Sequence, residues 1–308
     1  MPKFFLVTGF LGAGKTTFLK KFIPSLAPMR MHIIVNEYGK ESVDGPLLET
    51  LNTTLMQINN GSIFCTCKIN DFEDAMLHAI SNEPDCIVVE ASGLADPTAI
   101  RSIIEAPKFK DRIDYGGAIC MVDAMRFEKV YNTAKCTKKQ IAASDIVLLN
   151  KTDKTTNDKL IEVERVIRTH KPEMPIYRTT FGDFDMEWID GLDTSITIDD
   201  VEEYAVHAPD ISLQRFLIKV EPTTSLAQLQ YFLKIILEDS YRVKGFVEVE
   251  NQIHLVNCVG PMLNIDPYDD SKETNVGTLV VLSGEGLPIR KSLKRGFDQY
   301  KGQFVLTK

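Results

Sequence analysis

A glycine-rich segment near the N-terminus has the residue types and spacing to bind phosphate. Gly9–Thr16 reads GFLGAGKT, which fits G-x-x-x-x-G-K-[ST] between an apolar run and a helical pattern. Glycines let backbone N–H groups converge on phosphate oxygens, and the positive end of the following helix adds to the attraction. We expect Lys15 to contact the β- and γ-phosphates, Thr16 to coordinate Mg²⁺, and Thr17 to lie near the α-phosphate. The residues predicted to bind nucleotide here are Gly9, Gly12, Ala13, Gly14, Lys15, Thr16 and Thr17.

A second motif, N-K-x-D, follows another apolar run and consists of Asn150, Lys151 and Asp153. A carboxylate at this place can accept hydrogen bonds from N1–H and the exocyclic amine of guanine, whereas adenine offers no such pair of donors. A buried carboxylate left unpaired is costly, so such a site rejects the wrong base strongly. The motif therefore predicts a guanine nucleotide.

The third motif is EASGLADP at residues 90–97, directly after the apolar run 86–90. A carboxylate at a strand end beside a phosphate loop holds Mg²⁺ or the attacking water in hydrolytic NTPases, which makes Glu90 a candidate catalytic residue. Gly93 would let the loop move as the γ-phosphate comes and goes. The three motifs predict Mg-dependent hydrolysis of GTP to GDP and phosphate. Turnover should be slow, because no arginine within the motifs is placed to stabilise the transition state.

The elements that must position these motifs follow a strand–helix alternation. Runs rich in Val, Ile, Leu and Phe predict buried strands at 4–8, 32–36, 86–90, 118–123 and 146–150, with a short closing strand at 175–179. Helix-length stretches, such as 15–22 and 72–81, lie between them. This alternation predicts an α/β fold with a mainly parallel sheet flanked by helices, and the phosphate-binding motif after the first strand makes it one of the P-loop NTPase type.

The pattern loosens into acidic and turn-forming residues after about residue 183. We predict a GTPase domain at 1–195, a linker at 196–210 and a smaller α+β domain at 211–308. Within the last, the expected elements are a strand at 212–221, a helix at 225–237, a hairpin of 243–249 with 253–259, a strand at 278–282 and a basic helix at 290–300. The basic helix is either a docking surface or a solvated face.

Composition excludes several classes of protein. The 308 residues are 44% hydrophobic and 25% charged, as in a soluble globular protein, and no apolar run reaches the roughly 18 residues of a membrane helix. The net charge of −8 argues against nucleic acid or an anionic membrane as a partner. The N-terminus lacks the pattern of a secretion signal, and six irregularly spaced cysteines suit reduced thiols. We therefore expect a cytoplasmic protein.

Taken together, the motifs resemble the CobW family of P-loop GTPases, relatives of the maturation GTPases HypB, UreG and MeaB. Further resemblance lies in NEYG at 36–39 with Asp44, in NNGS at 59–62, and in YRVKGF at 241–246, which is similar to the R-x-K-G-F stretch of the CobW C-terminal domain. The resemblance implies a metallochaperone or metal-insertase that delivers zinc or cobalt to a client protein. It also implies that Glu37 and Asp44 lie in a switch region near Mg²⁺ and the γ-phosphate.

The chain departs from this family at its metal motif, C-x-C-C. Ser62 and Phe64 stand where the first two cysteines would be, Cys65 aligns with the third, and Cys67 is an additional thiol. In an extended segment, residues i and i+2 point to the same face, so Cys65 and Cys67 could hold one soft metal ion. A closed tetrahedral site needs two more ligands, which Glu37 or a client side chain could supply.

Two functions remain open from the sequence. In the first, GTP assembles the metal site and hydrolysis releases Zn²⁺ or Co²⁺ to a client metalloprotein. In the second, the chain has lost the metal site and acts as a GTP-driven client-gating or cofactor-loading chaperone of the corrinoid type, for a cofactor-dependent enzyme. A small-molecule kinase is disfavoured by N-K-x-D, and a scaffold without turnover would release no phosphate. We expect a monomer or a nucleotide-dependent homodimer.

Overall fold

The computed structural model describes residues 1–35, 53–57, 69–192, 194, 213–268 and 276–307. It divides into two compact units, Met1–Tyr131 with Lys135–Pro209, and Asn132–Ala134 with Asp210–Lys308. The linker predicted at 196–210 lies outside the described residues, and the predicted domain limits stay a prediction.

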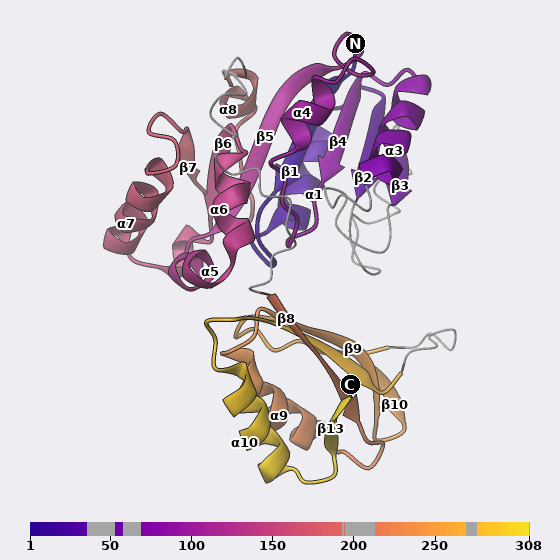
Figure 1. Cartoon of the computed structure of the whole chain (residues 1–308), viewed down its shortest axis with the longest axis vertical. Coiled ribbons are helices and arrows are strands. Elements are labelled where there is room, and N and C mark those ends of the chain that lie inside the picture. The colour runs from indigo at the N-terminus through magenta and orange to yellow at the C-terminus, as the bar shows by residue number, and fades with distance from the viewer. Residues whose placement is uncertain (36–52, 58–68, 193, 195–212, 269–275, 308) are drawn as a thin grey trace. The chain divides into compact units, whose positions relative to one another are not determined.

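The first unit is built on a seven-stranded sheet in the order β3-β2-β4-β1-β5-β6-β7, in which each pairing is parallel (Figure 1). Its strands are β1 (Lys3–Thr8), β2 (Met31–Val35), β3 (Thr53–Gln57), β4 (Cys86–Glu90), β5 (Asp114–Asp123), β6 (Ile146–Asn150) and β7 (Ile176–Arg178). Its helices are α1 (Lys15–Ser25), α3 (Ile69–Ser81), α4 (Ile100–Ile104), α5 (Phe127–Thr133), α6 (Lys135–Ala142), α7 (Asn157–Arg168) and α8 (Met186–Asp190), with a 3₁₀ turn at Thr152–Lys154. The six predicted strands are confirmed.

Helices cover both faces of this sheet because its central strands are apolar on both sides. In β1, Phe4 and Leu6 pack with α3 and α4, whereas Phe5 and Val7 pack with α1. This explains why the central strands form continuous apolar runs rather than alternating ones. The edge strand β3 was not expected, since its sequence TTLMQ is half polar.

The second unit is a six-stranded antiparallel sheet in the order β11-β10-β9-β12-β8-β13, packed against two helices (Figure 1). Its elements are β8 (Leu213–Val220), α9 (Leu226–Leu237), β9 (Arg242–Val249), β10 (Gln252–Val259), β11 (Ile265–Pro267), β12 (Thr278–Gly284), α10 (Ile289–Gln299) and β13 (Phe304–Thr307). The predicted α+β unit is confirmed, and the short strands β11 and β13 are additions to it.

Individual residues explain three features of the second unit. Ser225 and Gln228 form a capping box at the start of α9, in which each side chain accepts the other's backbone N–H. Glu250 and Asn251 both have positive φ, as the two central residues of a tight β9–β10 hairpin turn require. Gly245 of the R-x-K-G-F stretch is needed for close packing, since a Cβ there would lie 2.1 Å from the Thr278 carbonyl oxygen.

Candidate nucleotide-binding site

The phosphate loop joins the end of β1 to the start of α1 and is shaped by glycines. Gly9, Gly12 and Gly14 have φ values of 131°, 74° and 109°, which L-residues with side chains rarely adopt. A Cβ on Gly9 would lie 2.2 Å from the Met121 carbonyl oxygen, and one on Gly14 would lie 2.3 Å from the Asn150 amide nitrogen. The loop therefore packs directly on the ends of β5 and β6.

Lys15 is buried and folded over its own loop. Its Nζ donates to the carbonyl oxygens of Gly9, at 2.9 Å, and Phe10, at 3.4 Å. Both acceptors are neutral, so an anionic phosphate placed in the loop would compete favourably for the ammonium group. Thr16 is half-buried beside it, and Thr17 is exposed.

Glu90 and Thr16 meet at the carboxyl edge of the sheet. β4 pairs with β1 in a register that sets Glu90 beside Val7, and the Thr16 hydroxyl donates to Glu90 Oε1 at 3.4 Å. Glu90 is only 3% exposed. A hydroxyl and a carboxylate are the hard oxygen ligands that Mg²⁺ prefers, so these two residues fit that ion.

Asn150 and Lys151 bind the protein's own loops. The buried Asn150 side chain donates to the Ala13 carbonyl oxygen at 2.9 Å and accepts from the Gly182 N–H at 3.1 Å. Lys151 Nζ donates to the Gly12 carbonyl oxygen at 2.7 Å and to Asp123 Oδ2 at 2.6 Å. Both residues hold the phosphate loop to the end of β6, and their predicted contacts with a nucleotide stay predictions.

Asp153 is the member of N-K-x-D that faces outward. It lies in the 3₁₀ turn after β6, its side chain is 35% exposed, and it pairs with Lys154 at 3.4 Å. A surface pair of this kind contributes little, which leaves the carboxylate open to a ligand.

Two residues near the carboxyl ends of the strands were not predicted from the sequence to belong to the site. Asp123 ends β5, accepts hydrogen bonds from the N–H groups of Met125 and Arg126, and pairs with Lys151. Its position as a carboxylate at the end of a strand is the sequence feature that could have indicated a role in the site. Phe181 is 67% exposed with φ of 51°, next to Gly182, where a Cβ would lie 2.9 Å from the Phe18 backbone. The loop after β7 thus runs from the N-K-x-D motif to the start of α1.

The predicted metal-binding and switch residues are not among those that the structure describes. Glu37, Asp44, Cys65 and Cys67 lie outside the residues that the structure describes, as do Ser62 and Phe64. Across the described ranges, no group of three or more His, Cys, Asp or Glu side chains is arranged to hold a metal ion.

The described cysteines behave as core residues. Cys86, Cys120, Cys136 and Cys258 are free and buried. Burial raises the pKa of the Cys86 and Cys120 thiols to about 12, which keeps both protonated near neutral pH and makes them poor metal ligands.

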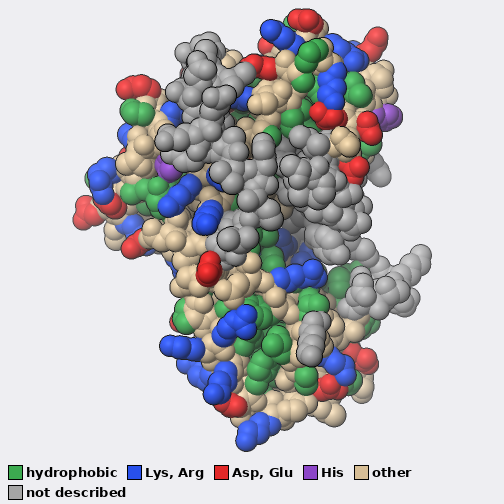
Figure 2. Space-filling model, viewed as in Figure 1, with side chains coloured by type: hydrophobic (Ala, Val, Ile, Leu, Met, Phe, Trp, Pro, Cys, Tyr) green, Lys and Arg blue, Asp and Glu red, His purple; other side chains and the backbone are tan. Residues whose placement is uncertain are grey.

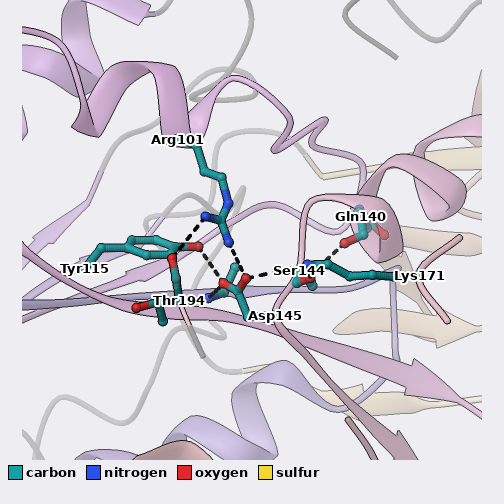
Figure 3. A network of polar contacts seen from close by, with 8 residues as sticks. Arg101, Tyr115, Gln140, Ser144, Asp145, Lys171 and Thr194 are labelled. Carbon is teal, nitrogen blue, oxygen red and sulfur yellow. Dashed lines mark hydrogen bonds and ion pairs between the residues drawn. The ribbon is translucent and has the colours of Figure 1, made fainter. Parts of the chain in front are cut away.

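A buried polar cluster lies at the opposite, amino edge of the sheet, around Asp145 (Figure 3). This carboxylate is fully buried and accepts from the Ala118 N–H at 2.8 Å, the Tyr115 hydroxyl at 2.7 Å and the Arg101 guanidinium, with Lys171 Nζ at 3.7 Å. Burial and the Asp145 charge raise the pKa of Tyr115 well above its usual value. No motif in the sequence marks these residues as a cluster.

The second unit carries a concentration of basic side chains. Arg290, Lys291, Lys294 and Arg295 are exposed on α10, and Figure 2 shows Lys and Arg side chains on the surface of this unit. A docking role for this helix stays a prediction. None of the helices in the described ranges is long and apolar enough to cross a membrane.

A parallel sheet with a phosphate loop after its first strand, and a lysine and a hydroxyl residue opening the next helix, defines a P-loop nucleotide-binding protein. The family model described as CobW/HypB/UreG, nucleotide-binding domain, matches residues 3–178, and that of the cobalamin synthesis protein cobW C-terminal domain matches residues 213–301. The chain belongs to the CobW/HypB/UreG family, which confirms the resemblance found in its motifs.

Several relatives are named zinc chaperones. YjiA of Escherichia coli is 33% identical over 188 residues, covering 59% of this chain and 58% of its own length. YeiR of the same species is 28% identical over 190 residues, covering 60% and 57%. CobW of Pseudomonas aeruginosa is 25% identical over 328 residues, covering 91% and 87%. The matched region thus spans less than two thirds of either E. coli relative.

Two solved structures are also similar to this chain. The Zn(II)-bound YjiA GTPase from E. coli is 21% identical, with 97% of this chain and 98% of that chain covered and a TM-score of 0.48. The hydrogenase maturation factor HypB of Archaeoglobus fulgidus is 15% identical, with 62% and 88% covered and a TM-score of 0.45.

Proposed function

We propose that this chain binds Mg·GTP, hydrolyses it to GDP and phosphate, and uses that cycle as a metallochaperone or metal-insertase that delivers Zn²⁺ or Co²⁺ to a client protein. The main observation in support of GTP hydrolysis is the contact between Thr16 and Glu90, whose side-chain oxygens are 3.4 Å apart, beside the buried Lys15 and the glycine loop. Membership of a nucleotide-binding family supports the same conclusion.

The chemistry follows from charge. Lys15 exchanges the Gly9 and Phe10 carbonyl oxygens for β- and γ-phosphate oxygens, and the loop N–H groups neutralise the charge that develops as water attacks the γ-phosphate. Mg²⁺, when bound, neutralises phosphate charge beside Thr16. Glu90, together with Glu37 and Asp44 of the switch region, orients the ion or the attacking water.

Base recognition is assigned to Asp153. Its carboxylate accepts from guanine N1–H and the exocyclic amine, while Asn150 and Lys151 hold the loops on which its position depends. The remaining loop residues, Gly9 to Thr17, bind the phosphates.

The metal half of the proposal rests on Cys65, Cys67 and Glu37 and on relatives named zinc chaperones. Two thiolates make an incomplete tetrahedral site, which suits an ion that is to be passed to a client. We further propose a cytoplasmic location, where thiols stay reduced, domain limits of 1–195 and 211–308, and a monomer or a nucleotide-dependent homodimer.

The test combines two measurements on the full chain. Phosphate release is followed with Mg²⁺ and either GTP or ATP, and Zn²⁺ and Co²⁺ are titrated against a calibrated chelator with a GTP analogue, with GDP and without nucleotide. The variant is Cys65→Ser/Cys67→Ser, and the matched control is Cys136→Ser/Cys258→Ser, which changes two buried thiols.

Tight stoichiometric binding of Zn²⁺ or Co²⁺ that requires the GTP analogue supports delivery of a metal, provided that it is lost in the Cys65→Ser/Cys67→Ser variant and kept in the control. Absence of metal binding with intact GTP hydrolysis contradicts the metal half and favours the cofactor-loading chaperone, in line with Phe64 in a ligand position. No release of phosphate from GTP contradicts the GTPase half.

A further inference from the structure

The loop after Glu90 packs against the phosphate loop at Gly93. A Cβ on Gly93 would lie 2.8 Å from the Leu11 backbone nitrogen and 3.0 Å from its Cα. Backbone therefore packs on backbone at this point, which only glycine permits. Leu11 belongs to the loop predicted to bind the phosphates. Gly93 therefore packs against the part of the protein where GTP and GDP would differ, because only GTP carries a γ-phosphate.

Helix α6 is hydrogen-bonded to this loop through Gln140. The Gln140 side chain is fully buried, and its Nε2 donates to the carbonyl oxygens of Gly93, at 3.2 Å, and Ala95, at 3.0 Å. Because both neighbours are acceptors, the amide must present its NH₂ group to them. Its Oε1 has no hydrogen-bond partner among the described residues.

The preceding residue of α6 makes a second attachment. Lys139 Nζ pairs with Asp96 Oδ2 at 2.5 Å, and the two side chains are 19% and 28% exposed. Asp96 Oδ1 in turn accepts from the Thr98 N–H, at 3.2 Å, and hydroxyl, at 2.7 Å. Two adjacent side chains of α6 therefore fix the loop at Gly93, Ala95 and Asp96.

The far end of α6 is itself anchored. The Ser144 hydroxyl donates to the Gln140 carbonyl oxygen at 2.6 Å, Lys171 Nζ donates to the Ser144 carbonyl oxygen at 3.1 Å, and Asp145 follows in the chain (Figure 3). Arg101, on the helix α4 that follows the loop, pairs with the same Asp145. The loop is thus attached to a buried, charge-compensated part of the core.

We infer that Gln140 is a positioning residue for the GTPase reaction, acting through the backbone of Gly93 and Ala95. The inference rests on the proposed function. Gln140 orders the loop in advance, so that binding a γ-phosphate beside Leu11 costs less conformational entropy. GDP has no γ-phosphate, so Gln140 sets the preference for GTP over GDP and the rate of hydrolysis, and leaves GDP affinity unchanged.

The experiment compares Gln140→Met, which keeps the side-chain length and removes the donor, with Gln140→Glu, which replaces the donor by an acceptor facing two carbonyls. The matched control is Gln228→Met, the same substitution at the cap of α9 in the second unit. Affinities for GDP and for a non-hydrolysable GTP analogue, single-turnover hydrolysis and thermal unfolding are measured for each.

We expect Gln140→Met to lower both the GTP-to-GDP affinity ratio and the hydrolysis rate about tenfold, with a larger loss in Gln140→Glu. GDP affinity should stay at the wild-type value, and Gln228→Met should lower stability without changing the ratio. Lys139→Met, at a partly exposed position, should act in the same direction by a smaller factor and serves if the Gln140 variants do not fold.

Wild-type hydrolysis and an unchanged affinity ratio in Gln140→Met would overturn the inference, as would an equal loss of GTP and GDP affinity, which is what a structural role alone predicts. A wild-type chain that neither binds nor hydrolyses GTP would overturn the proposed function, and this inference with it.

Discussion

The carboxyl ends and the amino ends of the parallel strands, called here the carboxyl edge and the amino edge of the sheet, differ in how their buried polar groups are paired. At the carboxyl edge, Lys15 and Thr16 make contacts at 2.9–3.4 Å with acceptors that a ligand can replace. At the amino edge, Asp145 is fully buried and surrounded by donors from Ala118, Tyr115 and two cationic side chains. A buried charge that is fully paired stabilises one structure, whereas one held by exchangeable contacts is ready to bind. The difference separates the scaffold of this protein from its site.

The largest effect is expected when the amino edge is broken. Asp145→Asn leaves Arg101 and Lys171 facing a neutral amide, so the free energy of unfolding should fall by about 3–5 kcal/mol. Denaturant unfolding measures the loss. The control is Asp183→Asn, which removes the exposed pair with Lys21 and should cost less than about 1 kcal/mol. Equal losses in the two variants would contradict the structural assignment of the Asp145 cluster.

The carboxyl edge should respond in activity rather than in stability. Lys15→Ala removes the ammonium group from the phosphate loop and should slow GTP hydrolysis by about 10²–10³-fold. The unfolding free energy should change less than in Asp145→Asn, because the hydrogen bonds from Lys15 to Gly9 and Phe10 end on neutral loop carbonyls. Phosphate-release kinetics and thermal unfolding test the two parts. Unchanged hydrolysis would remove the case for a P-loop mechanism.

Base recognition gives the next effect in size. Asp153→Asn replaces an acceptor by a donor where guanine presents N–H groups, so GTP affinity should fall by about 100-fold. Xanthosine triphosphate, which carries a carbonyl oxygen in place of the exocyclic amine, should bind better than it does to the wild-type chain. Competition binding with GTP, ATP and XTP measures both shifts. Equal affinity of the wild-type chain for ATP and GTP would contradict the role of Asp153.

The smallest effect concerns His32, near the start of β2 on the amino edge. Burial, and to a smaller extent the nearby His78, lower the pKa of His32 below 6.5. The unfolded chain therefore takes up this proton first as pH falls. Stability should drop below pH 6.5 by at most about 1.4 kcal/mol per pH unit, until the folded-state pKa is reached.

The comparison for this prediction is His32→Phe, which keeps an aromatic ring and cannot be protonated. The difference in unfolding free energy between the variant and the wild-type chain should change between pH 7 and pH 5 in favour of the variant. A difference independent of pH would show that His32 is not buried in its neutral form.

The sequence was sufficient wherever the information is local. The phosphate loop, N-K-x-D and EASGLADP are each contiguous, because a turn and a helix start are formed by neighbouring residues. Six of the seven strands of the parallel sheet were readable because burial on both faces demands unbroken apolar runs. Strands β3, β11 and β13 were not predicted because edge strands are buried less and retain polar or exposed positions.

Contacts between residues far apart in the chain could not be read from the sequence and follow from the packing of the whole unit. Asn150 reaches Ala13, and Lys151 reaches Gly12, which shows two motif residues holding the phosphate loop in place. Gln140 and Asp145 carry no sequence signature, because an amide or a carboxylate has the same identity on a solvated surface and in a buried network. Local sequence determines which turns and strands form, since their energetics involve near neighbours. The partner of a buried polar group depends on how the strands and helices pack, which is settled only when the whole unit folds.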